Sequence, residues 1–569
     1  MPILDFRNTN SLWCSVLVET LVRSGVAQAV VSPGSRSTPL TMALTRHPQI
    51  EAIPVLDERS AGFFALGLAK QHRRPTVLVC TSGTAGANYF PAVIEAQESG
   101  VPLLVITADR PPEMRDCASG QTIDQQKLFG GFVEFYHELA VPESKVELLR
   151  YLRQTIAHAA TRARRGPVHL NAPFRDPLPP IKDATAKDLE TELGEDFFAH
   201  LNTLDVAVTQ TTLWQRPTTA RGLIFAGTDA PADPAAYVKK VGELAEGLGW
   251  PVLADVLSPV RHLAAFPVVT AYDTILRNAA VARDLAPRTV LCLGGWPTSK
   301  VLRGWMEASG AEVLLVASDE ANRDALHGRT RQITAPVESL AVSGNKIPGD
   351  GYVAAWLEAE TKAASGLGAG LANETAFVEP KVTATLAENL PAGTPLFVAN
   401  SMPVRDLEYF WPASTRGVQI HFSRGANGID GTLSTALGVA HGNRPTVLLT
   451  GDLALLHDTN GFLSAQHFRG SLTIVLINNN GGGIFDHLPV AQFNPPFEKF
   501  WATPQDVNFG KLCAAYGVAH TVTRDGGQLA EAVAKLPESG VRVLEVLTDR
   551  KRDAAFRKKL FADVAATLK

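Results

Sequence analysis

Short apolar runs alternate with helix-length amphipathic stretches along the whole of this 569-residue chain. Fully apolar runs of strand length are typical of strands buried on both faces, and intervening helices produce parallel sheets with helices on each side. A chain of this length exceeds one hydrophobic core and is long enough for about three domains. We therefore expect an α/β protein of three doubly wound parallel-sheet domains.

The runs that predict buried strands occur in each third of the chain. They are PTVLVCTSG (75–83), VPLLVITAD (101–109), RGLIFAG (221–227), PVLADV (251–256), RTVLCLGG (288–295), AEVLLVAS (311–318), TPLFVANS (394–401), PTVLLTGD (445–452) and LTIVLINN (472–479). A segment rich in proline and charge (171–188) predicts a linker, and a weaker stretch, AASGLGAGLANETA (363–376), separates the middle from the last third. The expected domains are 1–180, 190–362 and 377–569.

Composition narrows the class of partner. The chain is 45% hydrophobic and 19% charged with a net charge of −4, which gives no reason to expect nucleic acid or a membrane surface. No run approaches the roughly 20 apolar residues of a membrane span, and the start, MPILDFRNTNSLW, does not resemble a signal peptide. Five scattered cysteines lack metal-ligand spacing. We expect a cytoplasmic protein with reduced thiols.

The first and last thirds resemble each other. GLAKQHRRPTVLVCTSG (67–83) aligns with GVAHGNRPTVLLTGD (438–452) with a single gap, which indicates one duplicated unit. In this alignment Asp452 falls opposite Ser82, and Asn479 falls opposite Asp109. The pair of a carboxylate and an amide therefore belongs to the last third only.

The stretch LINNNGGGIF (476–485) ends a strand in three asparagines and three glycines, which by themselves are ordinary turn formers. Asp452 and Asn479 end two strands 27 residues apart (452 to 479), which is the length of a strand-helix-strand crossover. Their oxygens suit Mg²⁺ or Mn²⁺, with the Gly481 carbonyl as a third ligand. We expect Asn478 and Asn480 to shape the loop instead.

The spacing G-D-x, 24 residues, N-N resembles the diphosphate and metal motif of thiamine diphosphate enzymes, although Leu453 stands where glycine is usual. Thiamine chemistry also requires a carboxyl group against the aminopyrimidine ring, to help generate the cofactor's carbanion. Glu58, in VLDERSAGFFALGLAK (55–70), is the candidate. By itself Glu58 could be a helix-start carboxylate facing the helix dipole, but the metal motif in the other copy favours the catalytic interpretation.

Seven blocks in order make the resemblance specific, and the chain is similar to the 2-succinyl-5-enolpyruvyl-6-hydroxy-3-cyclohexene-1-carboxylate synthase family of menaquinone biosynthesis. The match runs through both outer domains and is thin in the middle one. The blocks are VVSPGSRSTPL (30–40), DERSAGFFALGLAK (57–70), TSGTAGANYFPAVIEA (81–96), TADRPPEMRD (107–116), NSMPVRDLEYF (400–410), RGANGIDGTLSTALG (424–438) and NNNGGGIFDHLP (478–489).

The resemblance implies a thiamine diphosphate-binding fold and a transferase that uses thiamine diphosphate with Mg²⁺ or Mn²⁺. Its reaction would decarboxylate 2-oxoglutarate and add the resulting succinic semialdehyde carbanion to isochorismate in a 1,4 sense. It also implies a homodimer or homotetramer with active sites at the chain interface, because Glu58 and Asp452 lie in different domains.

The resemblance assigns two sets of site residues. The cofactor set is Glu58, Ser401, Ile429, Gly451, Asp452, Leu453, Asn479 and Gly481. The substrate set is Ser35, Arg36, Arg110, Gln121, Lys300, Ser401, Arg405, Arg424, Ile484, Phe485 and Leu488. Both substrates carry two carboxylates, so the basic residues are plausible clamps. Lys300 departs from relatives with a basic pair, because Val301 follows it, so a second charge would be lost or supplied elsewhere.

Three other functions were weighed. A different thiamine diphosphate-dependent 2-oxoacid decarboxylase, or an acetolactate-type carboligase, would act on substrates with fewer carboxylates, so the basic cluster argues against it. A nicotinamide-dependent dehydrogenase would need a G-x-G-x-x-G turn followed by an acidic residue, which is missing from the sequence. A non-catalytic relative would be expected to lack Glu58 or Asp452, and both are present.

Overall fold

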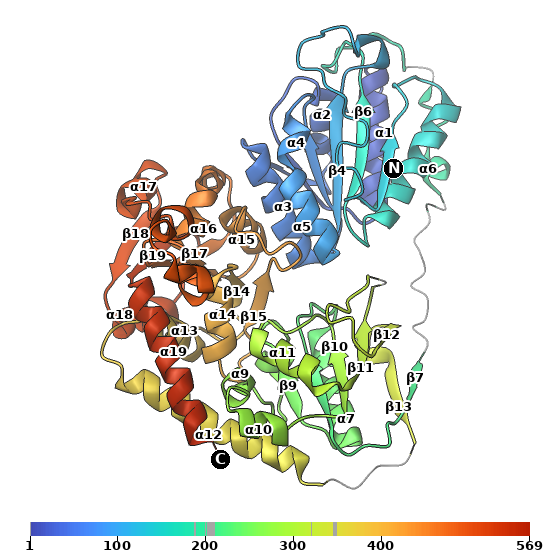
Figure 1. Ribbon diagram of the computed structural model, residues 1–569. Helices are drawn as coiled ribbons and strands as arrows, with labels where there is room; N and C mark the ends of the chain where they lie inside the picture. Colours follow the sequence, from blue (N-terminus) through green and yellow to red (C-terminus); the bar gives the residue numbers. More distant parts are fainter. Residues whose placement is uncertain are drawn as a thin grey trace.

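The computed structural model describes residues 2–186, 189–199, 201, 211–319, 321–344 and 350–568, so residues 187 and 188 of the expected linker lie outside the described residues. The described chain forms three large parallel sheets, each in its own region of the sequence (Figure 1). The predicted α/β class with three doubly wound domains is confirmed. None of its described helices combines the length and apolar character that a membrane span requires.

The first domain is built on a six-stranded sheet of order β2-β1-β3-β4-β6-β5. Its central strands are buried along their whole length, because helices cover both faces. The strands are β1 (Gln28–Val31), β2 (Glu51–Pro54), β3 (Thr76–Cys80), β4 (Leu103–Asp109), β5 (Phe135–Glu138) and β6 (Val168–Pro173), and the helices are α1 (Thr9–Arg23), α2 (Thr38–Arg46), α3 (Glu58–His72), α4 (Ala85–Asn88), α5 (Phe90–Ser99) and α6 (Val146–Arg162).

The last domain repeats this topology, with sheet order β15-β14-β16-β17-β19-β18. Taken in chain order, its strands occupy the same positions as those of the first sheet, which supports the duplication inferred from sequence. The strands are β14 (Pro395–Val398), β15 (Gln419–Phe422), β16 (Thr446–Gly451), β17 (Ser471–Asn478), β18 (Ala519–Thr523) and β19 (Gly540–Leu547), and the helices are α13 (Glu379–Asn389), α14 (Met402–Phe410), α15 (Thr432–Ala440), α16 (Asp452–His457), α17 (Phe509–Ala515), α18 (Gly526–Ala534) and α19 (Arg550–Thr567).

The middle domain has a five-stranded sheet of order β12-β11-β10-β8-β9 and a separate pair, β13-β7. Its order differs from that of the outer sheets, so it is not a third copy of the same arrangement. The strands are β7 (Thr212–Gln215), β8 (Gly222–Ala226), β9 (Val252–Ala254), β10 (Thr289–Leu293), β11 (Glu312–Ala317), β12 (Thr330–Thr334) and β13 (Leu340–Ser343), and the helices are α7 (Pro234–Leu248), α8 (Val260–Leu263), α9 (Tyr272–Ile275), α10 (Ala279–Asp284), α11 (Lys300–Ser309) and α12 (Tyr352–Asn373).

The two outer domains meet where α3 packs against α15, and one buried apolar cluster runs through both. A Cβ at Gly67 would lie 2.1 Å from the Thr435 carbonyl oxygen, and one at Gly438 would lie 2.1 Å from the Phe64 carbonyl oxygen. The two helices therefore approach backbone to backbone, which only glycine permits at these positions. This contact fixes the last domain against the first.

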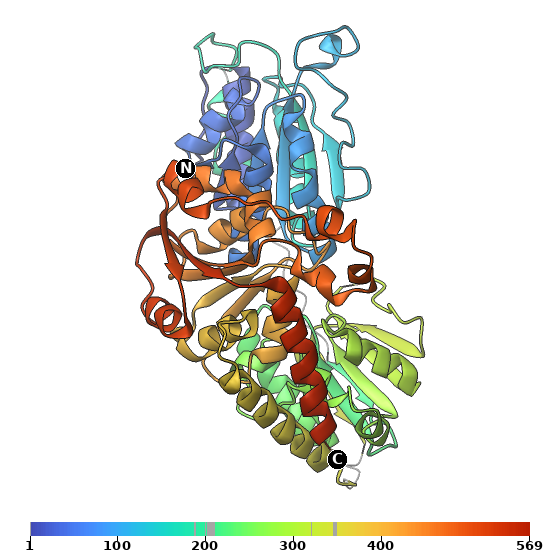
Figure 2. The same ribbon diagram turned by 60° about the vertical axis from the view of Figure 1, so that its left-hand side comes forward.

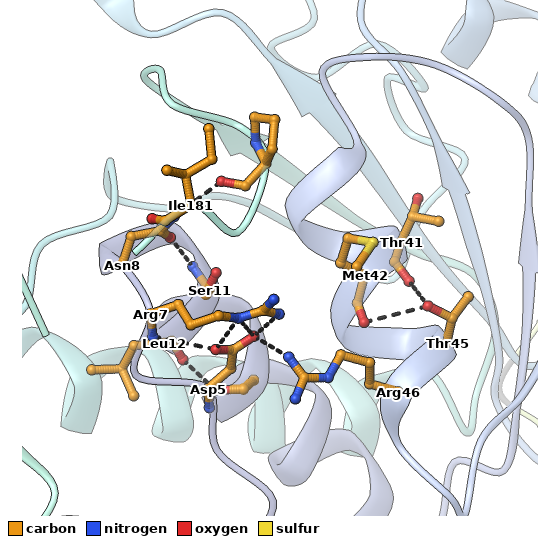
Figure 3. Close-up of polar contacts among 12 residues, drawn as sticks. Asp5, Arg7, Asn8, Ser11, Leu12, Thr41, Met42, Thr45, Arg46 and Ile181 are labelled. Carbon is orange, nitrogen blue, oxygen red and sulfur yellow. Dashed lines mark hydrogen bonds and ion pairs between the residues drawn. The ribbon is translucent and has the colours of Figure 1, made fainter. Parts of the chain in front are cut away.

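Polar contacts at the start of the chain tie the first domain to the segment that leaves it (Figure 3). The Asn8 side chain caps α1 by accepting from the Ser11 amide, and its Nδ2 donates to the Ile181 carbonyl at 2.9 Å. The Asp5 carboxylate accepts from Arg7 and from Arg46 of α2. The first part of the segment that follows β6 is thus held against the first domain.

Most of the stretch 363–376, which was expected to separate the middle from the last third, belongs to the long helix α12 (Tyr352–Asn373). Its small residues serve packing: α12 lies beside α19 in both views (Figures 1 and 2), and a Cβ at Gly370 would lie 2.1 Å from the Leu560 side chain. The glycines and alanines that suggest a linker allow two helices to approach closely. The segment at 171–188 also begins inside β6, which ends at Pro173. The domain boundaries stay a prediction.

Candidate active site

A cavity of about 570 Å³ lies at the carboxyl ends of β14, β16 and β17, with α11 of the middle domain on its far side. This is the edge of a parallel sheet at which ligands bind in doubly wound folds. Of the residues predicted from sequence, the cavity is lined by Lys300, Ser401, Arg405, Arg424, Ile429, Gly451, Asp452, Leu453, Asn479, Gly481, Ile484 and Phe485. The two halves of the predicted metal motif therefore share one site with most of the predicted clamps.

Asp452 and Asn479 come together because β16 and β17 are neighbouring parallel strands, with Gly451 paired to Ile477. Asp452 is 5% exposed, and its two carboxylate oxygens accept from the Leu453 and Gly481 amides, each at 2.8 Å. Burial is the main cause that raises the pKa of Asp452 to about 6. A nearby positive charge would favour the ionised form of this carboxyl.

The nitrogen and the oxygen of the Asn479 side-chain amide differ in their hydrogen bonding. Its Nδ2 donates to Glu379 Oε1 at 2.5 Å, whereas its buried Oδ1 has no hydrogen-bond partner in the described part of the chain. An orphaned buried carbonyl oxygen beside a carboxylate is the donor set of a hard divalent cation. The residues present thus fit a Mg²⁺ or Mn²⁺ ion.

The glycine run has a steric reason. Gly481 has φ of +137°, and a Cβ there would lie 2.3 Å from the Ala502 carbonyl oxygen. Asn478 Nδ2 donates to Glu545 at 2.7 Å, and Asn480 is exposed with φ of +55°. Asn478 ends β17 and binds the neighbouring strand β19, so the loop-shaping role expected for Asn478 and Asn480 stays a prediction. Gly481 could bring its backbone close to a bound ion.

Four cations face the cavity, namely Lys300 and three arginines. Within the described residues none of the four forms an ion pair with a carboxylate, although the Arg405 guanidinium donates to the Ser401 carbonyl at 2.6 Å and Arg424 donates to Asn400 at 2.9 Å. Burial lowers the pKa of Arg405 and Arg424, and the positive neighbours lower both further. Several cations that line one cavity without carboxylate partners form a site for a ligand with several negative charges.

Arg303 is the cavity cation that the sequence reasoning missed. It follows Lys300 by three residues on α11, so both side chains lie on one face of the helix, and its Nε donates to the Pro297 carbonyl at 2.6 Å. Val301 instead packs against the core of the middle domain. The i, i+3 spacing was the signal that could have identified Arg303.

Ser401 precedes α14, with φ of +72° and ψ of −132°. It does not occupy a helix interior, so the expectation that Ser401 and Arg405 share one helical face is corrected: the two are linked by the hydrogen bond from Arg405 to the Ser401 carbonyl. A non-glycine residue in this backbone region is costly and is common at functional sites. Both residues still line the cavity.

The predicted residues of the first domain form a second cluster outside this cavity. Arg110 donates to the Gln121 carbonyl at 3.0 Å and to the Ser82 hydroxyl, and the positive charge of Arg36 contributes to lowering the pKa of Arg110 after burial. Ser35 precedes Arg36 and is exposed. These residues follow the carboxyl ends of β1 and β4, so they lie at the equivalent edge of the duplicated sheet.

Glu58 and Leu488 also lie outside the cavity lining. Glu58 is the first residue of α3 and is half-buried, and the carboxylate of its neighbour Asp57 caps the helix by accepting from the Arg59 amide. No hydrogen bond ties down the Glu58 carboxylate within the described residues, and the negative charge of Glu58 contributes to raising the pKa of Tyr89 after burial. Leu488 follows the short helical turn Gly483–His487. Within the described residues Glu58 therefore does not share the cavity that Asp452 lines.

The parallel sheets, the duplicated outer domains and the pairing of Asp452 with Asn479 at two strand ends are features of a thiamine diphosphate-dependent enzyme. Three family models match: the N-terminal TPP binding domain of thiamine pyrophosphate enzymes over residues 14–128, the middle domain of thiamine pyrophosphate enzymes over 195–398, and the C-terminal TPP binding domain over 406–546. The two cofactor-binding matches thus cover most strands of the two outer sheets.

Curated relatives match the whole chain. The chain is 51% identical over 571 residues to a protein of Synechococcus elongatus, covering 100% of this chain and 98% of the relative, and 50% identical over 582 residues to one of a Nostoc species, covering 100% and 99%. A Gloeothece citriformis relative is 49% identical over 572 residues, covering 98% of each. All three are named 2-succinyl-5-enolpyruvyl-6-hydroxy-3-cyclohexene-1-carboxylate synthase. The chain belongs to this synthase family.

Proposed function

We propose that this enzyme decarboxylates 2-oxoglutarate and joins the four-carbon remainder to isochorismate, giving 2-succinyl-5-enolpyruvyl-6-hydroxy-3-cyclohexene-1-carboxylate and CO₂ in menaquinone biosynthesis. The observation that carries the proposal is one cavity that holds both the orphaned Asn479 oxygen beside Asp452 and four cations without carboxylate partners. The first feature suits a cation with a diphosphate, and the second suits substrates with two carboxylates each.

Asp452 and Asn479 would hold Mg²⁺ or Mn²⁺ through side-chain oxygens, and Gly481 through its backbone carbonyl. Gly451, Leu453 and Ser401 line the same cavity and would surround the diphosphate. When bound, thiamine diphosphate supplies the electron sink that decarboxylation of a 2-oxoacid requires. The Asp452 carboxylate accepts hydrogen bonds from two backbone amides, so it is fixed and would hold a bound ion in one place.

Glu58 would hold or release a proton at the aminopyrimidine ring of the cofactor. Its carboxylate is not engaged by hydrogen bonds within the described chain, so it is available for this task. Because Glu58 does not line its own chain's cavity, a second chain would supply it, which makes the enzyme a homodimer or homotetramer. Ser35, Arg36, Arg110 and Gln121, from the same domain as Glu58, would complete the substrate pocket from that side.

The cations of the cavity would bind substrate carboxylates. Arg405 and Arg424 are buried enough for their hydrogen bonds to be strong, and Lys300 and Arg303 extend the positive surface from α11. Arg303 supplies the second charge that Val301 cannot provide. Ile429, Ile484 and Phe485 line the cavity as apolar walls that exclude water, and Leu488 follows them in the chain.

The five cysteines are free, four of them buried, which suits the reducing cytoplasm that we infer as the location. The proposed domains keep the expected boundaries 1–180, 190–362 and 377–569, although α12 continues past residue 362 to Asn373, inside the second of these breaks.

The test is turnover by the purified full-length protein with thiamine diphosphate and Mg²⁺. We expect loss of isochorismate with CO₂ release when 2-oxoglutarate is the donor, and no comparable reaction with pyruvate. Turnover of pyruvate without 2-oxoglutarate activity would overturn the assignment in favour of another 2-oxoacid decarboxylase or an acetolactate-type carboligase. Omitting Mg²⁺ in the presence of a chelator is the matched control.

A further inference from the structure

Behind the cation site lies a buried group of charged residues to which the sequence resemblance assigns no role. Glu379 begins α13, Asp406 lies in α14 and Arg557 lies in α19, and each is at most 1% exposed. Arg557 donates through Nε to Asp406 at 2.7 Å and through a terminal nitrogen to Glu379. Buried charges of this kind are costly unless fully paired, so their retention requires a reason.

The link from this group to the cavity is the Asn479 amide. Glu379 Oε1 accepts from Asn479 Nδ2 at 2.5 Å, and a carboxylate oxygen can accept from the amide nitrogen but not from the amide oxygen. This contact fixes which end of the amide faces Glu379. The Asn479 Oδ1 atom consequently has no hydrogen-bond partner among the described residues, and Asn479 shares with Asp452 the cavity where the cation is proposed.

We propose that Glu379 is a positioning residue for the divalent cation, holding Asn479 with its carbonyl oxygen toward the ion, while Arg557 holds Glu379 in place. The inference rests on the proposed function, because it presumes that the cavity takes a cation with thiamine diphosphate. Partners of this kind, one step away from a metal, are generally needed to orient its ligands.

Charge supports the same role. Glu379 and Asp452 line the same cavity, so the Glu379 carboxylate adds a second negative charge to this site. A neutral asparagine contributes no net charge to the ion, so a second carboxylate nearby increases the attraction for a divalent cation. Arg557 is shared with Asp406, which keeps the arginine from cancelling the Glu379 charge completely.

The test measures binding of Mn²⁺ to the full-length protein by electron paramagnetic resonance, with saturating thiamine diphosphate. Glu379→Gln keeps the shape of the side chain but removes its charge and sets an amide nitrogen against Arg557 or against Asn479 Nδ2. We expect the Mn²⁺ dissociation constant to rise about 10–100-fold. The KM for Mg²⁺ should rise similarly while kcat at saturating Mg²⁺ is largely retained, a split that general structural damage would not give.

Glu408→Gln is the matched control, because Glu408 is an equally buried carboxylate paired to Arg261 that has no contact with Asn479. It should leave the Mn²⁺ affinity unchanged. An unchanged affinity in Glu379→Gln, together with loss of binding in Asp452→Ala, would overturn the positioning role and leave the proposed function standing. Failure of the wild-type protein to bind Mn²⁺ with thiamine diphosphate would instead contradict the proposed function itself.

If Glu379→Gln does not fold, Arg557→Lys provides the same test. A lysine ammonium lacks the planar fork that joins Glu379 to Asp406, so Glu379 would be held less firmly. The Mn²⁺ dissociation constant should again rise, and restoring arginine should return it. Wild-type affinity in Arg557→Lys would contradict the role of Arg557 and, with it, the proposed chain of contacts.

Discussion

Glu58 and Asp452 carry the two halves of the proposed chemistry, and their environments predict different losses. Glu58→Gln should retain Mg²⁺ and thiamine diphosphate binding yet lower kcat about 10²–10⁴-fold, because an amide cannot exchange the proton. Asp452→Ala should weaken cofactor binding itself, because it removes the only carboxylate of the ligand set. Calorimetric titration of thiamine diphosphate into each variant separates the two effects. Full activity of Glu58→Gln would show that the proton-transfer role is wrong.

Replacing Arg303 should lower substrate affinity with little change in the rate of the chemical step. A charge-assisted hydrogen bond contributes about 1.5–3 kcal/mol, so Arg303→Gln should raise the KM of at least one substrate about 10–100-fold. Arg303→Lys should recover part of this, because the charge is kept but the fork is lost. Steady-state kinetics with each substrate varied in turn makes the measurement. Unchanged KM values for both substrates would remove Arg303 from the clamp.

Site residues were easiest to predict from the sequence where a motif places them at a fixed spacing, each at the end of a strand. Asp452 and Asn479 lie together because their strands are adjacent, which a crossover of ordinary length already implies. Arg303 and Glu379 were missed because neither belongs to a matched block. Glu379 reaches Asn479 from 100 positions away in sequence, and only the packing of α13 on the sheet brings the two together.

At the scale of elements, the contact between α3 and α15 depends on two facing glycines. Gly67→Ala would place a Cβ 2.1 Å from the Thr435 carbonyl oxygen, so the helices must separate. We expect a loss of about 1–3 kcal/mol in stability, seen as a lower midpoint in thermal unfolding. Gly368→Ala is the control, because a Cβ added at this exposed position of α12 meets no atom within 4 Å. This substitution should stabilise the helix by about 0.5–1 kcal/mol. A Gly67→Ala midpoint at or above that of wild type would contradict this packing.

The first sheet contains a histidine whose ionisation should make the stability of the protein depend on pH. His169 of β6 is buried, and burial lowers its pKa to about 3, whereas the unfolded value is about 6.5. Below pH 6.5 the unfolded state binds the extra proton, so the contribution of neutral His169 to stability is lost progressively as pH falls toward 3. The stability of wild type relative to His169→Gln should therefore fall by about 1.4 kcal/mol per pH unit below 6.5. Urea unfolding of both proteins at pH 7.5 and 5.5 checks the difference, and a constant difference would contradict it.

The long helix α12 shows where composition misleads about elements. Its alanines and glycines resemble a flexible connection when read alone, but Gly366 lies against Val564 and Gly370 against Leu560 of α19. Helix propensity and local spacing do not reveal which glycines face a partner helix, because that depends on a segment almost 200 residues away. Strands with continuous apolar runs bounded by turn residues, such as β4, β10 and β17, were predicted from the sequence. Short and partly exposed strands, such as β2 and β12, were not predicted, because they lack such runs.

At the scale of the whole molecule, the separation of Glu58 from the Asp452 cavity predicts complementation between chains. Glu58→Gln and Asp452→Ala should each be inactive alone, but co-assembled chains should regain about a quarter of wild-type activity, because half the dimers would be mixed and each would hold one intact site. Activity of the co-expressed and co-purified pair is the measurement. Mixed assemblies that stay inactive would place both groups of a working site on one chain.

The arrangement of three domains explains why the middle one matters although it lacks the duplicated topology. It contributes Thr298 and, from α11, Lys300 and Arg303 to a cavity whose remaining lining comes from the last domain. The cofactor motifs predict the outer domains from sequence. The contribution of α11 depends on how the domains pack, which no local pattern encodes.

The most direct test of the central claim is the stoichiometry of the overall reaction. With thiamine diphosphate and Mg²⁺, the wild-type protein should release one CO₂ from 2-oxoglutarate for each isochorismate consumed, and Asp452→Ala should show neither change at the same cofactor concentration. CO₂ release that proceeds at the same rate without isochorismate, or isochorismate loss without CO₂ release, would contradict the account.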